Sequence, residues 1–416
     1  MMVHGRALTE VGLLVYLLTI PMGRGLETWS RELPLVAVMA GMVLARIPWP
    51  RTAESSAPFR LLIPLVLFAV STLLSTLFSE FPDKSLARAA YSPIAFLLFL
   101  ATQEVAITPT AYRRILLVFA AVVIVLGLDG TYQFRTGVSL LGGSLPFSGR
   151  ITGSLPHPND LALIPILLPS ALTLVILDPL AWASRLILCG LPFAFATVIL
   201  SQSRNAWLGL AVGLGTLAAL GSRRRLILFT AMLAVTLFGV AYALGIGNVP
   251  NRTQKILETF HEPRIGHWLV AWQMFKESPL LGKGVHTFGE FYLPYLEKIV
   301  LPASIRPEVA YIPWAHNLYL EVLAERGMVG SIAFGATLVA MALVLFECLK
   351  WRTPSETRTI SIGLTASLVT FLVQGVFDLT FLKDWVILVF WLLAALVARL
   401  PTRSLASSLH LRLRRS

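Results

Sequence analysis

Charged residues are scarce in this chain. Only 13% of its 416 residues are Asp, Glu, Lys or Arg, and 56% are hydrophobic, whereas an ordinary soluble domain is about 25% charged. A chain of this size with so few charges has too much apolar surface for a water-exposed globule. The composition therefore excludes the soluble globular class.

Cysteine is also scarce, with only two residues, Cys189 and Cys348. Both fall inside or at the end of apolar runs, so we expect neither a disulfide framework nor a zinc site. The Asp-x-Asp, P-loop and Gly-x-Ser-x-Gly motifs are missing as well, which argues against the sites that they build.

Three histidines, His261, His267 and His286, lie in one polar segment. Their spacing does not place them on one helical face, and a metal ion needs convergent ligands. We therefore expect solvated histidines, no metal site and no cofactor.

Long apolar runs recur from end to end, and each is long enough to cross a hydrocarbon core of about 30 Å. They predict an all-α polytopic membrane protein with about twelve spans. The expected spans are 7–21, 33–47, 59–79, 88–103, 112–130, 159–177, 183–200, 205–220, 225–245, 328–349, 360–377 and 385–400.

The basic residues indicate the orientation of these spans. With the N-terminus in the cytoplasm, the inner loops and tails hold 18 Lys and Arg and the short outer loops hold 8. Inner loops of membrane proteins are enriched in these residues, so we expect both termini in the cytoplasm. The net charge of +12 is then explained by membrane topology rather than by nucleic-acid binding.

Two polar loops interrupt this pattern on the outer side. One, about 131–158, is rich in Gly, Ser and Pro, and the other is a long stretch over 246–315. We expect spans one to nine in 1–245, a periplasmic-type subdomain in 246–327, and the last three spans with a basic tail in 328–416.

Arg204 stands between two apolar runs in "LSQSRNAWLGL". A charge near membrane depth is costly, and two interpretations remain open. The side chain reaches the interface from a helix end, or it forms an anion site together with the hydrogen-bonding residues around it. The density of donors favours the anion site.

A helix is expected to start after Pro263, because proline suits the first turn of a helix. One face of this helix carries Arg264 followed by an aromatic stripe: Trp268, Ala271, Trp272 and Phe275. Either the helix lies on the membrane with a chance charge, or the stripe is buried and aims Arg264 at a phosphate. Lys283, in the Gly-punctuated turn "SPLLGKGVHTF", is a further candidate cation.

A His-Asn pair, His316-Asn317, precedes the tenth span, and Gly327-x-x-Gly330 follows it. Gly327 is a helix stop signal, which predicts a short helix over 316–326. His316 is either an ordinary helix-start residue with Asn317 as its cap, or a general base, since histidine titrates close to neutral pH. Asn317, Gly327 and Gly330 would support that base.

Asp378, in "QGVFDLTFLKDW", lies at the outer end of the eleventh span. It is either a loop cap or a carboxylate that assists His316. The topology places Arg204, Arg264, His316 and Asp378 on the same side of the membrane although they come from four separate segments. That placement predicts one convergent site with two cations, one base and one carboxylate.

These motifs resemble the O-antigen ligase and polymerase superfamily of bacterial membrane glycosyltransferases. The resemblance rests on His316-Asn317 with its glycines, the Arg204 turn, the Arg264 helix leading into "SPLLGKGVHTF", "SLPHPNDLA" at 154–162, and "GVFDLTF" at 375–381. It covers about residues 120–395. The length and basic character are most similar to O-antigen ligase.

The resemblance implies a GT-C-like fold in the bacterial inner membrane, with the active site facing the periplasm. It implies an inverting, metal-independent transfer of O-antigen polysaccharide from undecaprenyl pyrophosphate to lipid A–core, during lipopolysaccharide biosynthesis. In this scheme Arg204 and Arg264, with Lys283, hold the donor pyrophosphate, His316 deprotonates the acceptor hydroxyl, and Asp378 assists. A pyrophosphate leaving group needs charge stabilisation more than a protonating acid, and one base predicts inversion.

Other functions stay open at the level of sequence. The same site would serve an O-antigen polymerase or a protein O-oligosaccharyltransferase. A polysaccharide transporter or flippase has a similar number of spans, but transport sites need ionisable residues or broken helices near mid-membrane. Asp129 and Glu347, the acidic candidates within the runs, lie near span ends, which disfavours transport.

Overall fold

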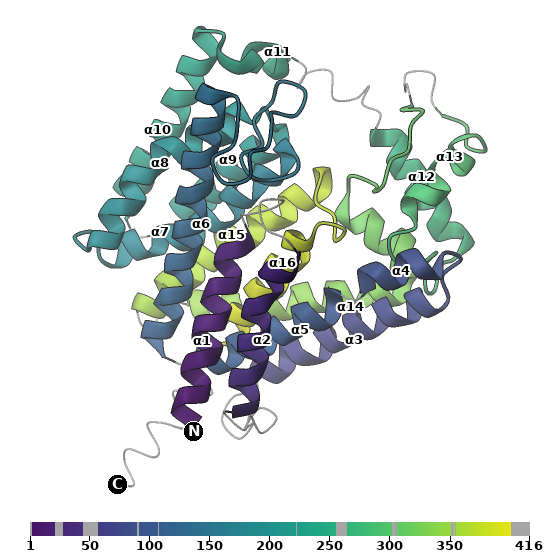
Figure 1. Ribbon diagram of the computed structural model, residues 1–416, viewed down its shortest axis with the longest axis horizontal. Coiled ribbons are helices and arrows are strands. Elements are labelled where there is room, and N and C mark those ends of the chain that lie inside the picture. Colours follow the sequence, from purple (N-terminus) through teal and green to yellow (C-terminus); the bar gives the residue numbers. More distant parts are fainter. Residues whose placement is uncertain are drawn as a thin grey trace.

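The computed structural model describes residues 2–20, 28–44, 57–89, 91–106, 108–221, 223–254, 264–301, 305, 307–350, 353 and 355–400. Within these residues the chain is helical, with one isolated antiparallel bridge between Phe147 and Arg150. Backbone groups in a bilayer must bond within their own segment, which only helices and closed barrels achieve. The apolar runs therefore fold as helices (Figure 1).

The helices follow one another along the chain in this order: α1 (Met2–Thr19), α2 (Thr28–Leu44), α3 (Ala57–Leu77), α4 (Pro82–Ala89), α5 (Tyr91–Val105), α6 (Pro109–Thr136), η2 (Pro158–Ala162), α7 (Leu163–Leu177), α8 (Trp182–Leu200), α9 (Arg204–Leu220), α10 (Arg224–Ala243), η3 (Ile246–Asn248), α11 (Val249–Gln254), α12 (Arg264–Glu277), α13 (Phe288–Leu296), α14 (Leu318–Leu349), α15 (Ser355–Phe377) and α16 (Asp384–Ala398).

The prediction of an all-α polytopic membrane protein is confirmed, and each expected span coincides with a helix. The number of strong spans is smaller than twelve. Within the described residues, seven helices are long and apolar enough to cross a membrane, and three further apolar helices are shorter. The difference arises at helices such as α16, whose 15 residues fall below the roughly 20 that a perpendicular crossing needs.

The centre of the bundle is formed by α7, α15 and α16. The α7 sequence has no charged residue and is buried almost throughout, and α16 is buried from Trp385 to its end. Helix α7 packs against α15, α6 and α9, and α16 packs against α5 and α14. A helix that is apolar on every side belongs in such an interior position.

Helix α10 shows the opposite behaviour at the edge of the bundle (Figure 1). Its large apolar side chains point outward, as Leu228, Phe229, Met232 and Val235 show. In water such a surface would be unfavourable. In a bilayer it faces acyl chains, as expected for a span.

Helices α12 and α13 pack beside the start of α14 and share a second hydrophobic cluster, which includes Met274, Phe288 and Tyr292. Helix α14 is broken at Gly327, where φ is 62° and ψ is −161°. The expected helix stop at this glycine is therefore confirmed, although the helix begins at Leu318 rather than at 316.

Gly327 also permits a close backbone contact. A Cβ at this position would lie 2.4 Å from the carbonyl carbon of Leu280, so only glycine fits. The neighbouring Met328 and Val329 amides donate to the carbonyls of Pro279 and Leu280, at 2.8 and 3.2 Å. The turn after α12 thereby satisfies backbone groups that the helix break leaves open.

Candidate active site

His316 and Asp378 meet as the sequence predicted, although they come from different segments. His316 Nδ1 lies 2.5 Å from Asp378 Oδ1, and the Asp378 side chain is 1% exposed. His316 has a left-handed backbone with φ 51°, which is uncommon for a residue other than glycine. Asn317 follows as the N-cap of α14, its side chain accepting from the Tyr319 and Leu320 amides.

This pairing fixes which ring nitrogen of His316 can act as a base. A carboxylate only accepts hydrogen bonds, so Nδ1 carries the proton that faces Asp378. The Trp314 indole nitrogen also lies 3.1 Å from Nδ1, but it is itself a donor, so in this tautomer it packs against the ring without a hydrogen bond. Nε2 is then left with the free lone pair, the arrangement that a general base requires. The His316 side chain remains 19% exposed, so solvent or a substrate can reach the ring.

A second imidazole packs on the first. The rings of His267 and His316 are stacked with centroids 5.3 Å apart, and His267 is buried. Burial lowers the pKa of His267 to about 3, with help from His316 and the Arg264 guanidinium. His267 is therefore neutral, and the expectation that this loop histidine is solvated was wrong.

The orientation of α12 also differs from the prediction. Its buried face carries Gly266, His267, Val270, Ala271 and Met274, while Trp272 of the expected stripe is 46% exposed. The small and aliphatic residues fit against α13 and α14, which leaves Trp272 exposed and Trp268 and Phe275 half-buried. His261 and Pro263 lie outside the described residues. The third loop histidine, His286, has a left-handed backbone with φ 62°.

Lys383 lies near the His316–Asp378 pair and contacts a second carboxylate. Its ammonium lies 2.8 Å from Asp160 Oδ1, and Asp160 belongs to η2 in the "SLPHPNDLA" segment. Burial opposes the charge on Lys383, but the Asp160 and Asp378 carboxylates raise its pKa overall. Burial likewise opposes the charge on Asp378, but Lys383 and His316 lower its pKa overall. Asp378 thus remains a carboxylate.

The outer loop after α6 is folded around two buried polar side chains of that helix. Asp129 accepts hydrogen bonds from the Ser139 hydroxyl and the Leu140 amide, and Gln133 accepts from the Thr152 and Gly153 amides. These contacts satisfy backbone amides of a loop that has no helix or sheet to bond them. They fix the strand-like turn that presents Arg150.

Arg150 is held at the inner edge of this loop. Its Nε donates to the Ser201 carbonyl and its Nη2 to Asn159 Oδ1, both at 2.9 Å. Burial and the Arg252 guanidinium lower its pKa to about 10, and Arg264 and Arg204 contribute in the same direction against the Asp378 carboxylate. Three guanidiniums, those of Arg204, Arg252 and Arg264, are thus close enough to Arg150 for their charges to act on it.

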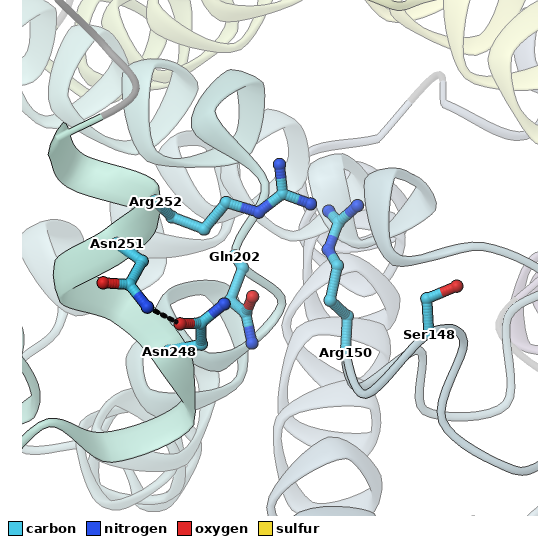
Figure 2. Close-up of a pocket in the computed structure, with 6 residues that line it drawn as sticks. All are labelled: Ser148, Arg150, Gln202, Asn248, Asn251 and Arg252. Carbon is cyan, nitrogen blue, oxygen red and sulfur yellow. Dashed lines mark hydrogen bonds between the residues drawn. The ribbon is translucent and has the colours of Figure 1, made fainter.

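Arg204 occupies the first turn of α9, where Ser203 caps the helix by accepting from the Ala206 amide. The charges of Arg264 and Arg252 both act on it. The structure therefore brings the two predicted arginines together, and it adds Arg150 and Arg252 to them. Figure 2 shows Arg150 and Arg252 extending toward each other across a pocket of about 200 Å³.

Lys283 does not join this group by any contact in the described residues. Its ammonium lies 2.9 Å from Glu80 and 3.3 Å from Glu277. Burial opposes its charge, but hydrogen bonds with Glu80 and Tyr295 raise its pKa overall. The expectation that Lys283 holds a donor phosphate finds no support in this arrangement, because two carboxylates already neutralise it.

Together these features define a class: a polytopic membrane protein with a His–Asp pair beside a group of arginines, suited to moving a proton near a strongly anionic substrate. Residues 189–335 match the family model described as O-antigen ligase. The matched residues include Arg204, Arg264 and His316, so the match agrees with the resemblance that the motifs indicated. A search of curated proteins finds no match to the chain.

Arg150, Arg252 and Lys383 are residues of this region that the sequence did not single out, and His267 was predicted only to be a solvated histidine. Arg150 lies in a loop with weak periodicity, and Arg252 lies in a helix of only 6 residues. Lys383 had one available signal, since it follows Asp378 by five positions in the same quoted motif. His267 lies three positions after Arg264, the spacing that places two residues on neighbouring faces of a helix.

Proposed function

We propose that this protein is an O-antigen ligase that transfers a glycan from undecaprenyl diphosphate to a sugar hydroxyl of lipid A–core. The observation that carries the proposal is the His316–Asp378 pair beside Arg204 and Arg264, within a chain that has the family domain. The proposal places the site on the periplasmic side of the inner membrane and both termini in the cytoplasm.

The chemistry follows from the free Nε2 of His316. Nε2 takes the proton of the acceptor hydroxyl, and the oxygen attacks the anomeric carbon of the donor sugar. The bond from that carbon to the phosphate oxygen breaks, and its electron pair stays on the departing undecaprenyl diphosphate. A single displacement of this kind inverts the anomeric configuration. Asp378 stabilises the imidazolium that forms, as a buried carboxylate does in other His–Asp pairs.

The arginines act on the leaving group. The diphosphate gains negative charge as the glycosidic bond breaks, and guanidiniums form charge-assisted, often bidentate hydrogen bonds to phosphate oxygens. Such stabilisation of developing charge is commonly the largest contribution to catalysis. Arg264 starts α12 and Arg204 starts α9, so the positive ends of both helix dipoles add to the effect.

The test is glycan transfer by the purified full chain, with lipid-linked donor and rough lipopolysaccharide as acceptor. We expect His316→Ala to reduce the transfer rate by at least about 10²-fold, the contribution typical of a general base. The matched control is His4→Ala, because His4 is exposed at the start of α1. Transfer at the wild-type rate in the His316 variant would remove the base from the mechanism.

The same assay, repeated with different acceptor substrates, distinguishes a ligase from a polymerase and from a protein oligosaccharyltransferase. Rough lipopolysaccharide alone should sustain transfer by a ligase, whereas a polymerase would need a second lipid-linked glycan. A protein oligosaccharyltransferase would need a polypeptide acceptor. Glycan transfer only to either of these alternatives would contradict the ligase assignment while keeping the role of His316.

A further inference from the structure

The pocket between Arg150 and Arg252 has no role in the transfer described so far. It is lined by Ser148, Arg150, Gln202, Asn248, Asn251 and Arg252. These side chains come from three segments: the loop after α6, the α8–α9 turn, and the η3–α11 segment. All six are polar, so the pocket is unsuited to an acyl chain.

Its charge is unbalanced. Within the described residues, no carboxylate forms an ion pair with Arg150 or Arg252, whereas Lys283 and Lys383 are each paired with carboxylates. The positive charge of Arg252 also lowers the pKa of Arg150, which shows that the two repel each other. Buried or half-buried charges in native proteins are normally paired, so this pocket is built for an anion.

The backbone of the pocket is also unusual. Five residues other than glycine have positive φ in the described chain: Ser148, Gln202, Asn248, His286 and His316. Three of the five line this pocket and a fourth is the proposed base. Left-handed backbone at residues such as Gln202, with φ 53°, costs free energy and concentrates at ligand sites.

From these observations we infer that the pocket is a second phosphate subsite, and that it makes the protein select lipids with a diphosphate over lipids with a single phosphate. The inference rests on the proposed function. Arg204 and Arg264 provide guanidiniums for one phosphate, and Arg150 and Arg252 provide them for the next. Gln202 of the pocket lies two positions before Arg204, and Arg150 donates to the Ser201 carbonyl of the same turn, so the two subsites are neighbours.

The amide side chains complete the subsite. Asn251 donates to Asn248 Oδ1 (Figure 2), which orients both amides at the edge of the pocket. Gln202 is buried in the α8–α9 turn, directly before the Ser203 cap and Arg204. The turn that positions Arg204 therefore also contributes to the wall of the second subsite.

The test compares undecaprenyl diphosphate with undecaprenyl monophosphate in equal amounts, bound to the purified full chain and quantified by native mass spectrometry. The two lipids share one tail, so its contribution cancels in the ratio of the bound forms. We expect the wild type to prefer the diphosphate by about tenfold or more, the scale of a lost charged hydrogen bond. Arg252→Gln should bring the ratio close to one.

Arg252→Lys serves as a second variant, which keeps the charge but loses the planar fork; it should retain part of the preference. The matched control is Arg135→Gln, because Arg135 is an exposed arginine at the end of α6 outside the pocket. It should keep the wild-type ratio. A wild-type ratio in Arg252→Gln, or equal binding of both lipids by the wild type, would overturn the inference.

His316→Ala separates this inference from the proposed function. It should lose transfer and keep the wild-type lipid ratio, because the base does not contact the pocket residues. If the wild type transferred no glycan but its ratio still depended on Arg252, the proposed function would fail and the phosphate subsite would stand.

Discussion

The two halves of the site solve the same electrostatic problem in opposite ways. On the side of His316, the buried charges have partners of the opposite sign: Lys383 pairs with Asp160, the Asp378 carboxylate also acts on Lys383, and Asp378 contacts the imidazole. On the side of Arg150 and Arg252, the described residues supply cations with no paired carboxylate. We call the first half balanced because each of its charges has a partner within the protein. In the second half the described residues offer no such partner, so an anion would supply it.

This difference separates positioning from binding. A balanced set of buried charges holds its members in a fixed geometry, which suits a base that must keep one tautomer. A set of charges of one sign attracts a ligand of the opposite sign, and the repulsion between its members falls when that ligand binds. The turn between α15 and α16 carries both Asp378 and Lys383, so it ties the α14 side of the site to η2.

The largest expected effect comes from breaking the balanced half. Asp378→Asn removes the carboxylate that orients His316, and it leaves Lys383 with only one buried partner. We expect the transfer rate to fall by about 10²- to 10⁴-fold, the upper value being that of the comparable change in a Ser-His-Asp triad. The rate at saturating donor and acceptor measures this.

The control for Asp378→Asn is the same substitution at Asp384, six positions later, whose carboxylate pairs with Arg88 at 2.5 Å. That variant should transfer glycan at close to the wild-type rate. A similar loss in both variants would mean that the α15–α16 turn had been disrupted, rather than the His316 pairing.

A smaller effect should distinguish two cations that the sequence treated alike. Arg264→Gln is expected to weaken donor binding by about 10- to 100-fold, because it removes a charged hydrogen bond. Lys283→Gln should leave donor binding unchanged, since Lys283 is already paired with Glu80 and Glu277. The KM for the lipid-linked donor reports both, and an equal rise in the two variants would contradict the comparison.

The sequence predicted the helices and the members of the His316–Asp378 pair for a physical reason. Apolar runs of bilayer length allow few structures other than helices, and the charge asymmetry of the loops predicts their orientation. Once the spans were oriented, Arg204, Arg264, His316 and Asp378 had to lie on one side. The contact between His316 and Asp378 followed from that constraint and from the family resemblance.

The same reasoning failed where tertiary packing decides the outcome. One of the two alternatives for α12 buried its aromatic stripe, but Trp272 is exposed, and α12 buries His267 and Met274 because α13 and α14 fill the space beside them. Lys283 resembled a phosphate ligand until the fold placed Glu80, which lies about 200 positions earlier, against it. Arg252 gave no signal, because a short helix after a span has no periodicity to read.

The smallest expected effect tests the neutral imidazole that lies beside the balanced half. Burial holds the pKa of His267 at about 3, well below its ordinary value near 6.5. A group with a lowered folded-state pKa contributes stability that is complete above the unfolded pKa and is lost as the pH falls through that value. Acidification from pH 7 to pH 5 should therefore cost about 2 kcal/mol at this residue.

His267→Phe should reduce that acid sensitivity, because phenylalanine fills the buried site without binding a proton. The apparent midpoint of thermal unfolding at pH 7 and at pH 5 measures it, with His4→Phe as the exposed control. Some sensitivity should remain, since burial and Lys383 also lower the pKa of His157, to about 4. If the midpoints at pH 7 and pH 5 differ as much in His267→Phe as in the wild type, His267 is not neutral by burial. The stacked imidazoles would then carry a charge that the surrounding arginines oppose.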